Sequence, residues 1–518
     1  MRWSIPFIVA AASLLAPQSQ AADLRLALSS SPSAMDPHYQ NLGANQNISQ
    51  NIFDSLVRMD PDSRIIPGLA DRWTRVNDTT WDFHLRDATF HNGQKLTVDD
   101  VIFSLDRPPT LVNSPAGFGI YVKSIVSKTA IDDHTLRIVT NGPYPLLLSD
   151  LSLIFILNKK ESQGLATEDF ARGKGMVGTG PYRFLSFLRD DRVELAPFPE
   201  TWQPKPVWDH VTVRMIPNGA SRLAGLLSGD VDAIEGVPTN DLANVKANPK
   251  LTFAQKISSR IIYLYIDSGR DDSPQVFAKD GSKLPHNPLK DVRVRQALSM
   301  AINRPAIADR VLAGLGYPTA NLVPETLFGY DPTLKVMPYD PDQAKKLLAE
   351  AGYPDGFSVV INGPNDRFVN DAQVVQAVAQ FYARIGVSAK VDTFPMSTYA
   401  PRGAKGEFSL GMIGFGSQTG ESSSTLRAII ACADPKTGGG LYNWSFYCNH
   451  DVDNFVSQAL ITADDPARLV LLQKAAHLAI DTGAILPLYF QATTWAAKQG
   501  MGIIPRTDER TFAAGFTP

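Results

Sequence analysis

The stretch that most constrains the fold is residues 177–217, where a turn is followed by three short apolar runs. The turn contains Gly178 and Gly180, which can adopt positive φ, and Pro181, which fixes φ and ends any preceding helix. The apolar residues of the runs are Tyr182, Phe184, Phe187, Val193, Leu195, Val211, Val213 and Met215. Because side chains of a strand point alternately to opposite faces, this pattern predicts strands of a half-buried sheet.

The length and charge of the chain limit the class of protein. Its 518 residues exceed what one hydrophobic core usually supports, so we expect two or more domains. The 49 Lys and Arg residues nearly balance the 52 Asp and Glu residues, which gives a net charge of −3. A nucleic-acid-binding protein needs a concentrated basic surface, which this balance does not favour. We therefore expect no nucleic-acid partner.

The N-terminus has the organisation of an export signal. Arg2 precedes an apolar run at residues 5–15, and Ser19-Gln20-Ala21 has the small-x-small pattern of a cleavage site. This run is too short to span a bilayer, and no later apolar stretch is long enough. We therefore interpret residues 1–21 as a signal peptide, and we expect an exported protein that is not inserted in the membrane.

Strand and helix patterns alternate along the rest of the chain. Residues 22–29 have the alternation of a strand, and residues 358–394 have the order strand, helix, strand, which predicts a parallel pair. Between the first strand and the next apolar stretch lies a polar, Asn-rich segment at 30–50, which we expect to be a loop. Residues 52–59 are then expected to form a short helix.

Two helix starts are marked by capping residues. Thr97 is followed three residues later by Asp100, and Asp340 is followed by Pro341 and then Gln343. A polar side chain at the N-cap accepts hydrogen bonds from the first free backbone N–H groups of a helix, and Pro suits the first helical position. We therefore expect helices to begin just after Thr97 and Asp340.

Motifs typical of enzymes occur only in unsuitable contexts. Gly173, Gly175 and Gly178 have the spacing of a dinucleotide-binding loop, but a polar segment precedes them and Pro181 follows, where a strand and a helix are needed. Ser417 lacks the flanking glycines of a nucleophile elbow. The eight histidines and two cysteines have neither His-x₃-His nor Cys-x-x-Cys spacing. We predict no enzyme activity, no cofactor and no metal site.

The chain has two cysteines, Cys432 and Cys448. An exported protein meets an oxidising compartment, where such a pair can close a loop as a disulfide. Two buried free thiols are the alternative that the spacing leaves open.

Several segments resemble the periplasmic dipeptide- and oligopeptide-binding proteins, known as solute-binding protein family 5. They are PGLADRW at 67–73, GTGPYRF at 178–184, Thr201-Trp202 before Lys205-Pro206, VTVRMIP at 211–217, and the helical passages that begin at Asn287 and Asp340. The resemblance runs from about residue 22 to about residue 510. It implies an α/β, two-lobed periplasmic binding-protein fold (type II, cluster C-like) with an extra small α+β domain in the first lobe.

The resemblance also implies boundaries and a disulfide. We expect lobe I to comprise 22–55 and 177–267, the small accessory domain 56–176, lobe II 268–489, and the return to lobe I 490–518. Relatives in the dipeptide branch have cysteines at places that match Cys432 and Cys448, which implies that these two residues are bridged.

Arg367 is the first candidate for solute binding. It follows a strand at the expected lobe interface, where α/β proteins usually bind ligands, and a guanidinium can hold a carboxylate through two parallel hydrogen bonds. In dipeptide-binding members an Arg in this loop holds the ligand's carboxylate. The resemblance implies the same role here; an ion pair of Arg367 with Asp366 or Asp371 is the alternative.

A second loop, 416–424, departs from the family pattern. Peptide-binding relatives place an Asp here against the peptide's α-ammonium, whereas this position holds Gln418 and the nearest carboxylate is Glu421. Either Glu421 binds the ligand's ammonium in place of that Asp, or the ligand has no free ammonium. Asn45 and Tyr265 are weaker candidates, because a satisfied turn or a core contact explains each of them at least as well.

The resemblance implies the substrate-binding component of an ABC importer. Such a protein, which we expect to be a periplasmic monomer, captures a peptide-like solute between its lobes by hinge closure and delivers it to membrane permease subunits. The same role for an opine, a modified sugar or a haem-like ligand is one alternative. A secreted enzyme is the other.

Overall fold

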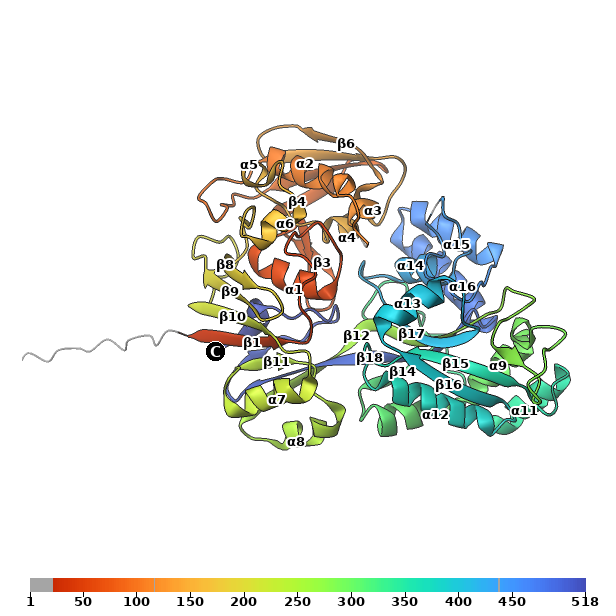
Figure 1. Ribbon diagram of the computed structural model, residues 1–518. Coiled ribbons are helices and arrows are strands. Elements are labelled where there is room, and N and C mark those ends of the chain that lie inside the picture. Colours follow the sequence, from red (N-terminus) through yellow and green to blue (C-terminus); the bar gives the residue numbers. More distant parts are fainter. Residues whose placement is uncertain (1–21, 116, 437) are drawn as a thin grey trace, which may run out of the picture.

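The computed structural model describes residues 22–115, 117–436 and 438–518, so the predicted signal peptide lies outside the described residues. Two lobes lie side by side, and two long strands run between them (Figure 1). Within the described ranges, no helix is both long and apolar enough to cross a membrane.

The two lobes share one twelve-stranded sheet. The strands that join them are β12 (Leu251–Ile266) and β18 (Ile485–Lys498), which pair in antiparallel fashion with a break in register between Ile257 and Ile261. Along the sheet the order is β13 (Val276–Phe277), β15 (Ser358–Pro364), β17 (Leu410–Gly416), β12, β18, β11 (Ala233–Glu235), β1 (Asp23–Leu28), β10 (His210–Met215), β9 (Arg192–Pro197) and β8 (Tyr182–Leu188), with β14 (Gly316–Pro318) beside β18 and β16 (Ser388–Phe394) beside β15. The crossing from one lobe to the other therefore lies at residues 258–260 and near Gln491.

Lobe I contains the strands that the apolar alternation predicts. β1 is parallel to β10, and the antiparallel strands β9 and β8 complete this end of the sheet. The side chains that alternate toward the core are fully buried: Leu24, Leu26, Val193, Leu195, Val211 and Val213. Helices α7 (Gly219–Ser228) and α8 (Leu242–Ala247) belong to the same lobe, and α7 ends at Gly229 in the left-handed conformation.

The turn before β8 packs against the end of α1 (Gly43–Ile52). A Cβ atom at Gly178 would lie 1.9 Å from the carbonyl oxygen of Ile52, and one at Gly180 would lie 2.7 Å from the carbonyl carbon of the same residue. Only glycine permits two chains to approach so closely. The glycines predicted from sequence to form a turn thus also allow helix and turn to touch.

Asp54 joins three segments just after this helix. Its carboxylate accepts hydrogen bonds from Thr179 Oγ1 at 2.8 Å, Trp202 Nε1 at 2.8 Å and Gln203 Nε2 at 2.6 Å. Asp54 is buried, and this desolvation raises its pKa, while Arg58 and the three donors oppose the rise. Two separated pieces of the family-like sequence, one with Thr179 and one with Trp202, therefore meet at the Asp54 carboxylate.

The prediction of a helix at residues 52–59 is wrong. The helix is α1, Gly43–Ile52, inside the polar segment, and the chain then continues to the short strand β2 (Val57–Met59), which pairs with β3 (Ile65–Pro67). The Asn residues of α1 disfavour a helix in isolation, but tertiary hydrogen bonds use them: Asn47 Oδ1 accepts from Thr511 N and Asn51 Oδ1 from Ala513 N. Contacts with the distant C-terminal segment override the local propensity.

The small domain has a four-stranded antiparallel sheet. Its strands, in order, are β4 (Ala70–Arg75), β5 (Thr80–Leu85), β7 (Thr135–Thr140) and β6 (Ile125–Ala130), with helices α2 (Val98–Asp106), α3 (Gly119–Val122), α4 (Leu147–Leu151), α5 (Lys159–Ser162) and α6 (Thr167–Ala171). The predicted cap is confirmed, because Thr97 and Asp100 form a reciprocal capping box at the start of α2. Figure 1 shows α3 and α4 on the side of this domain that faces lobe II.

Lobe II contains the predicted β-α-β unit. β15 and β16 are parallel and are joined by α12 (Asp371–Ala383). The other helices are α9 (Val292–Met300), α10 (Arg304–Ala306), α11 (Pro341–Glu350), α13 (Met396–Ala404), α14 (Ser422–Thr425), α15 (His450–Ile461) and α16 (Asp465–Asp481). Asp340 caps α11 by accepting from Gln343 N, as predicted. The predicted Cys432–Cys448 disulfide is confirmed in this lobe.

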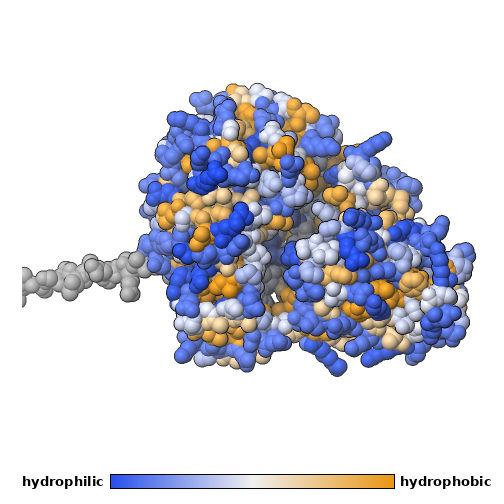
Figure 2. Space-filling view, viewed as in Figure 1, coloured by the Kyte–Doolittle hydropathy of each residue, from blue (hydrophilic) through white to orange (hydrophobic). Residues whose placement is uncertain are grey.

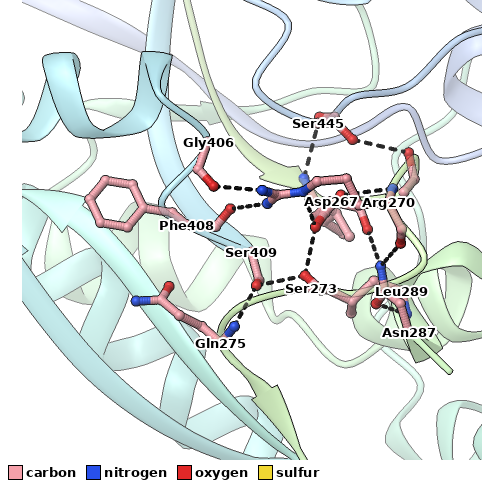
Figure 3. A network of polar contacts seen from close by, with 12 residues as sticks. Asp267, Arg270, Ser273, Gln275, Asn287, Leu289, Gly406, Phe408, Ser409 and Ser445 are labelled. Atoms are coloured by element: carbon pink, nitrogen blue, oxygen red, sulfur yellow. Dashed lines mark hydrogen bonds and ion pairs between the residues drawn. The ribbon is translucent and has the colours of Figure 1, made fainter. Parts of the chain in front are cut away.

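A buried polar network fixes the lobe II end of β12 (Figure 3). Asp267 is fully buried and accepts from Arg270 Nε at 2.8 Å and Ser273 Oγ at 2.6 Å. Arg270 in turn donates to the carbonyl oxygens of Gly406 and Phe408, just before β17. The crossing strand is thereby attached firmly to lobe II.

We predict that Gly178→Ala lowers the free energy of unfolding by at least about 2 kcal/mol, because the new methyl group overlaps the Ile52 carbonyl oxygen. Gly142→Ala is the matched control, since nothing lies within 4 Å of a Cβ built there. Urea denaturation of both variants measures the effect. Equal stability of the two variants would contradict the close approach of turn and helix.

Candidate functional site

The surface is hollowed between the two lobes (Figure 2). Side chains from both lobes meet across this cleft. Asn41, which precedes α1, donates from Nδ2 to Gln418 Oε1 of lobe II and to the Tyr121 hydroxyl of the small domain, the latter at 3.0 Å. Gln418, the residue at the place of the relatives' Asp, therefore contacts lobe I directly.

Two other hydrogen bonds join the lobes away from Gln418. Arg75 Nη1 donates to the carbonyl oxygen of Ala463 at 3.2 Å, and Asn370 Nδ2 donates to Thr239 Oγ1 at 3.0 Å. Asn370 precedes α12 and adopts a left-handed conformation with φ of 50°. These contacts link the small domain and lobe I to lobe II.

Arg367 follows β15 on the lobe II side of the cleft, and its side chain is exposed to solvent. The Asp371 carboxylate accepts from the backbone N–H groups of Arg367 and Phe368, both at 3.0 Å, and so shapes the loop. Among the described residues, no carboxylate lies within ion-pair distance of the Arg367 guanidinium, although Asp366 and Asp371 influence it at longer range. The nearby Arg260 and, after it, desolvation lower the pKa of Arg367, and Glu509 opposes this.

Arg260 and Glu509 form an ion pair beside Arg367. Arg260 lies at the lobe crossing in β12, and its Nη2 is 2.6 Å from Glu509 Oε2, with Nε 3.0 Å from Oε1. Glu509 comes from the C-terminal segment, and its φ of 64° is left-handed. One carboxylate thus lies in the electrostatic field of two guanidinium groups.

The C-terminal segment 506–511 contributes more charge to the site than sequence reasoning foresaw. Arg506 Nη2 is 2.6 Å from Asp508 Oδ2, and the same nitrogen donates to the backbone oxygens of Met59 and Asp60. Arg510 lies 3.9 Å from Asp508 and influences the Tyr121 hydroxyl. The available signal was the run Arg506-Thr507-Asp508-Glu509-Arg510, four charges in five residues directly after the last strand pattern.

Glu421 is placed inside lobe II and is already paired. Its Oε2 lies 2.6 Å from Arg468 Nη1, and its Oε1 accepts from Ser423 Oγ. Both side chains of the ion pair are buried, with exposed fractions of 6% for Glu421 and 7% for Arg468. Burial raises the pKa of Glu421 and Arg468 opposes that rise. A ligand ammonium would have to compete with this guanidinium.

The two weaker candidates are used within their own lobes. Tyr265 is buried, and its hydroxyl lies 2.9 Å from that of Tyr399. Asn45 is buried in α1, where Oδ1 accepts from Ser33 N at 2.9 Å and Nδ2 donates to the Gln40 carbonyl oxygen. The hydrogen-bonding atoms of both side chains are thus bonded within the protein.

One group of side chains has the composition of a metal site. Donor atoms of Cys432, Cys448, His450 and Asp453 lie within 4.8 Å of one another. The two sulfurs are joined in the disulfide, so they offer no thiolate to a metal. Asp453 instead accepts from Cys432 N at 3.0 Å and supports the bridged loop.

Asp150 is a buried acid on the small-domain side of the lobe contact. It lies in α4, and its Oδ2 accepts from the Tyr144 hydroxyl at 2.6 Å. Burial raises the pKa of Asp150 to about 8; the Tyr144 hydrogen bond lowers it, Glu421 of lobe II adds to the rise, and Arg427 opposes it. The effect of two lobe II residues on Asp150 agrees with the facing positions of α4 and α14 in Figure 1.

We predict that Asp150 makes stability fall as the pH rises. An unfolded Asp has a pKa of about 4, so between about pH 4 and the folded pKa of about 8 the folded state holds the extra proton. The stabilisation is present at low pH and is lost as the pH rises toward 8. Asp150→Asn cannot titrate, so its stability relative to wild type should increase from about pH 5 to about pH 8 in urea denaturation. A difference that does not change with pH would contradict this assignment.

We predict that Glu421→Gln lowers the free energy of unfolding by about 3 kcal/mol, because it leaves the buried Arg468 charge without its main counterion. The control is Asp465→Asn. Asp465 also contacts Arg468, at 3.3 Å, but its side chain is 70% exposed, so its loss should cost less than about 1 kcal/mol. Equal effects in thermal or urea unfolding would show that Glu421 is not the main structural partner.

The geometry agrees with the results of comparison with known proteins. The family model "Bacterial extracellular solute-binding proteins, family 5 Middle" matches residues 64–437. The dipeptide-binding protein of Escherichia coli is 27% identical over 477 residues, covering 86% of this chain and 85% of that protein. The glutathione-binding protein GsiB of the same species is 29% identical over 470 residues, covering 88% and 86%.

A solved structure has the same fold. HbpA2 from Haemophilus parasuis superimposes with a TM-score of 0.79 at 24% identity, over 96% of this chain and 99% of that chain. The two-lobed α/β fold is thereby confirmed. With more than two thirds of its length matched by the family model, the chain belongs to the bacterial extracellular solute-binding proteins of family 5.

Proposed function

We propose that this protein is the periplasmic solute-binding component of an ABC importer and that it captures a peptide-like solute in the cleft between its lobes. Family membership and the peptide-binding relatives support this role. The observation that supports the solute assignment is the exposed Arg367 guanidinium, which lies in the loop after β15 and has no carboxylate within ion-pair distance among the described residues. Such a group suits a carboxylate of the solute.

Closure follows from the way the lobes are joined. The register of β12 against β18 breaks at the crossing, and Ser258 Oγ donates there to the Gln491 carbonyl oxygen at 2.8 Å. A hinge needs only a few residues that absorb backbone rotation while both lobes stay rigid. Rotation at 258–260 and near Gln491 would open the cleft, and closing it would enclose the solute for presentation to the permease subunits.

A secreted enzyme would consume its ligand, whereas a receptor returns it. Incubating the protein with a mixture of di- and tripeptides, followed by mass spectrometry, separates the two. We expect the peptides to be recovered unchanged from the protein after denaturation. Time-dependent appearance of new products in proportion to protein concentration would contradict a receptor.

We predict that Arg367→Ala weakens binding of a carboxylate-bearing peptide by about 2–5 kcal/mol, measured by titration calorimetry. Arg384→Ala is the matched control: Arg384 follows the other end of α12, about 20 Å away along the helix, and donates to the Tyr339 hydroxyl. Arg384→Ala should leave the dissociation constant unchanged. Equal affinity of wild type and Arg367→Ala would show that Arg367 has no part in binding.

A further inference from the structure

Four acids near the cleft have partners. Glu421 Oε2 lies 2.6 Å from Arg468, Glu509 Oε2 lies 2.6 Å from Arg260, Asp508 Oδ2 lies 2.6 Å from Arg506, and Asp150 Oδ2 accepts from Tyr144 at 2.6 Å. A carboxylate that is already paired with a guanidinium is a poor receptor for a second cation, because its charge is compensated. Glu421, Glu509 and Asp508 are therefore poor receptors for a ligand ammonium.

Two guanidinium groups near the same cleft, those of Arg367 and Arg510, lack such hydrogen-bonded partners among the described residues. In the part of the chain that the structure describes, neither Arg367 nor Arg510 donates a side-chain hydrogen bond to protein. Arg510 is 3.9 Å from Asp508, whose carboxylate Arg506 already holds in two hydrogen bonds. The Arg510 side chain is only 12% exposed. No Arg510 nitrogen is among the fully buried atoms without a partner, so its N–H groups keep contact with solvent and an anionic group can reach them.

Arg510 is held in place by a fixed backbone. On its N-terminal side Thr507 N donates to the Pro61 carbonyl oxygen, and Ser259 N donates to the Thr507 carbonyl oxygen, both at 2.9 Å. On its C-terminal side Thr511 N donates to Asn47 Oδ1 at 3.0 Å. The segment is thus tied to α1, to the β2–β3 turn and to the crossing strand β12.

Arg510 and Arg367 approach the cleft from opposite lobes. Arg510 influences the Tyr121 hydroxyl, which accepts from Asn41, the residue that contacts Gln418 across the cleft. Arg367 of lobe II lies near Arg260 and near Glu509 of the same C-terminal segment. A solute enclosed here would meet one guanidinium from each lobe that donates no side-chain hydrogen bond to the described protein.

We propose that Arg510 is a second anion-binding residue of the cleft and that the solute carries two anionic groups, such as two carboxylates, with no need for a free α-ammonium. The inference rests on the proposed solute-binding function and specifies its ligand class. Arg367 receives one anionic group and Arg510 the other. Gln418, a neutral amide bonded to Asn41, offers only hydrogen bonding between them.

The test compares ligands that differ by one charge. N-acetyl-alanyl-glutamate has two carboxylates and no ammonium, N-acetyl-alanyl-glutamine has one carboxylate, and free alanyl-glutamine adds the ammonium. A series of simple dicarboxylates, from succinate to suberate, provides the same two charges without a peptide bond and at varied spacing. Titration calorimetry is carried out with the full chain after its signal peptide is removed.

We expect wild type to bind the best dianion at least about tenfold more tightly than N-acetyl-alanyl-glutamine, since charge-assisted hydrogen bonds are the stronger ones. Arg510→Gln should abolish this preference, and Arg510→Lys, which keeps the charge, should retain part of it. If a variant does not fold, the comparison of dianionic and monoanionic ligands on the wild-type protein still tests the proposal.

The outcomes separate this inference from the proposed function. Binding of mono- and dianionic peptides with equal affinity, or tightest binding of free alanyl-glutamine, overturns the second anion site and leaves the receptor role intact. Binding of dicarboxylates alone, lost in Arg510→Gln, supports the anion site and rejects a peptide-like solute. A preference that survives in Arg510→Gln also overturns the role of Arg510, and absence of all binding contradicts both proposals.

Discussion

The antiparallel pairing of β12 with β18 is the constraint on which the rest of the molecule depends. These strands carry main-chain hydrogen bonds from one lobe into the other, so each lobe completes its sheet on a shared pair. The direction of β18 also returns the chain to lobe I, where segment 506–511 enters the space beside α1. The cleft and the charges at its edge are therefore consequences of one strand pairing. At the crossing, this pairing is interrupted by a break in register between Ile257 and Ile261.

The family-like sequence pieces have a physical reason to occur together. Gly178 and Gly180 permit the turn to touch the end of α1, and Thr179 between them donates to Asp54. Trp202 completes that contact and in turn lies under the Arg86 guanidinium, 3.9 Å from the ring centroid. Because each piece satisfies or shields a buried group of another, a change in one would leave a polar atom unpaired. The motif at residues 177–217 therefore forms one connected set of contacts between lobe I and the small domain.

Sequence reasoning succeeded where structure is set locally and failed where partners are distant. The strands of lobe I and the caps at Thr97 and Asp340 follow from neighbours within a few residues, and they were predicted. Helix α1 was missed because its Asn side chains are satisfied by residues more than 460 positions away. Glu421 left two interpretations open for the same reason, since Arg468 lies 47 positions along the chain and no local pattern reports it. The charge run at 506–510 was visible, but only the fold brings it to the cleft.

The hydrogen bonds between the lobes are individually weak. Their weakness affects how a solute would control closure of the lobes. The bonds between Asn41 and Gln418 and between Thr239 and Asn370 join neutral groups, each worth about 1 kcal/mol net. Arg260 and Arg367 meanwhile repel each other, with Glu509 compensating one of the two charges. Under the proposed function, a solute whose anionic group contacts Arg367 and lobe I together would bind the closed form more tightly than the open form. A ligand shifts an equilibrium only by such a difference in affinity, and the proposed contacts with Arg367 and Arg510 would provide it.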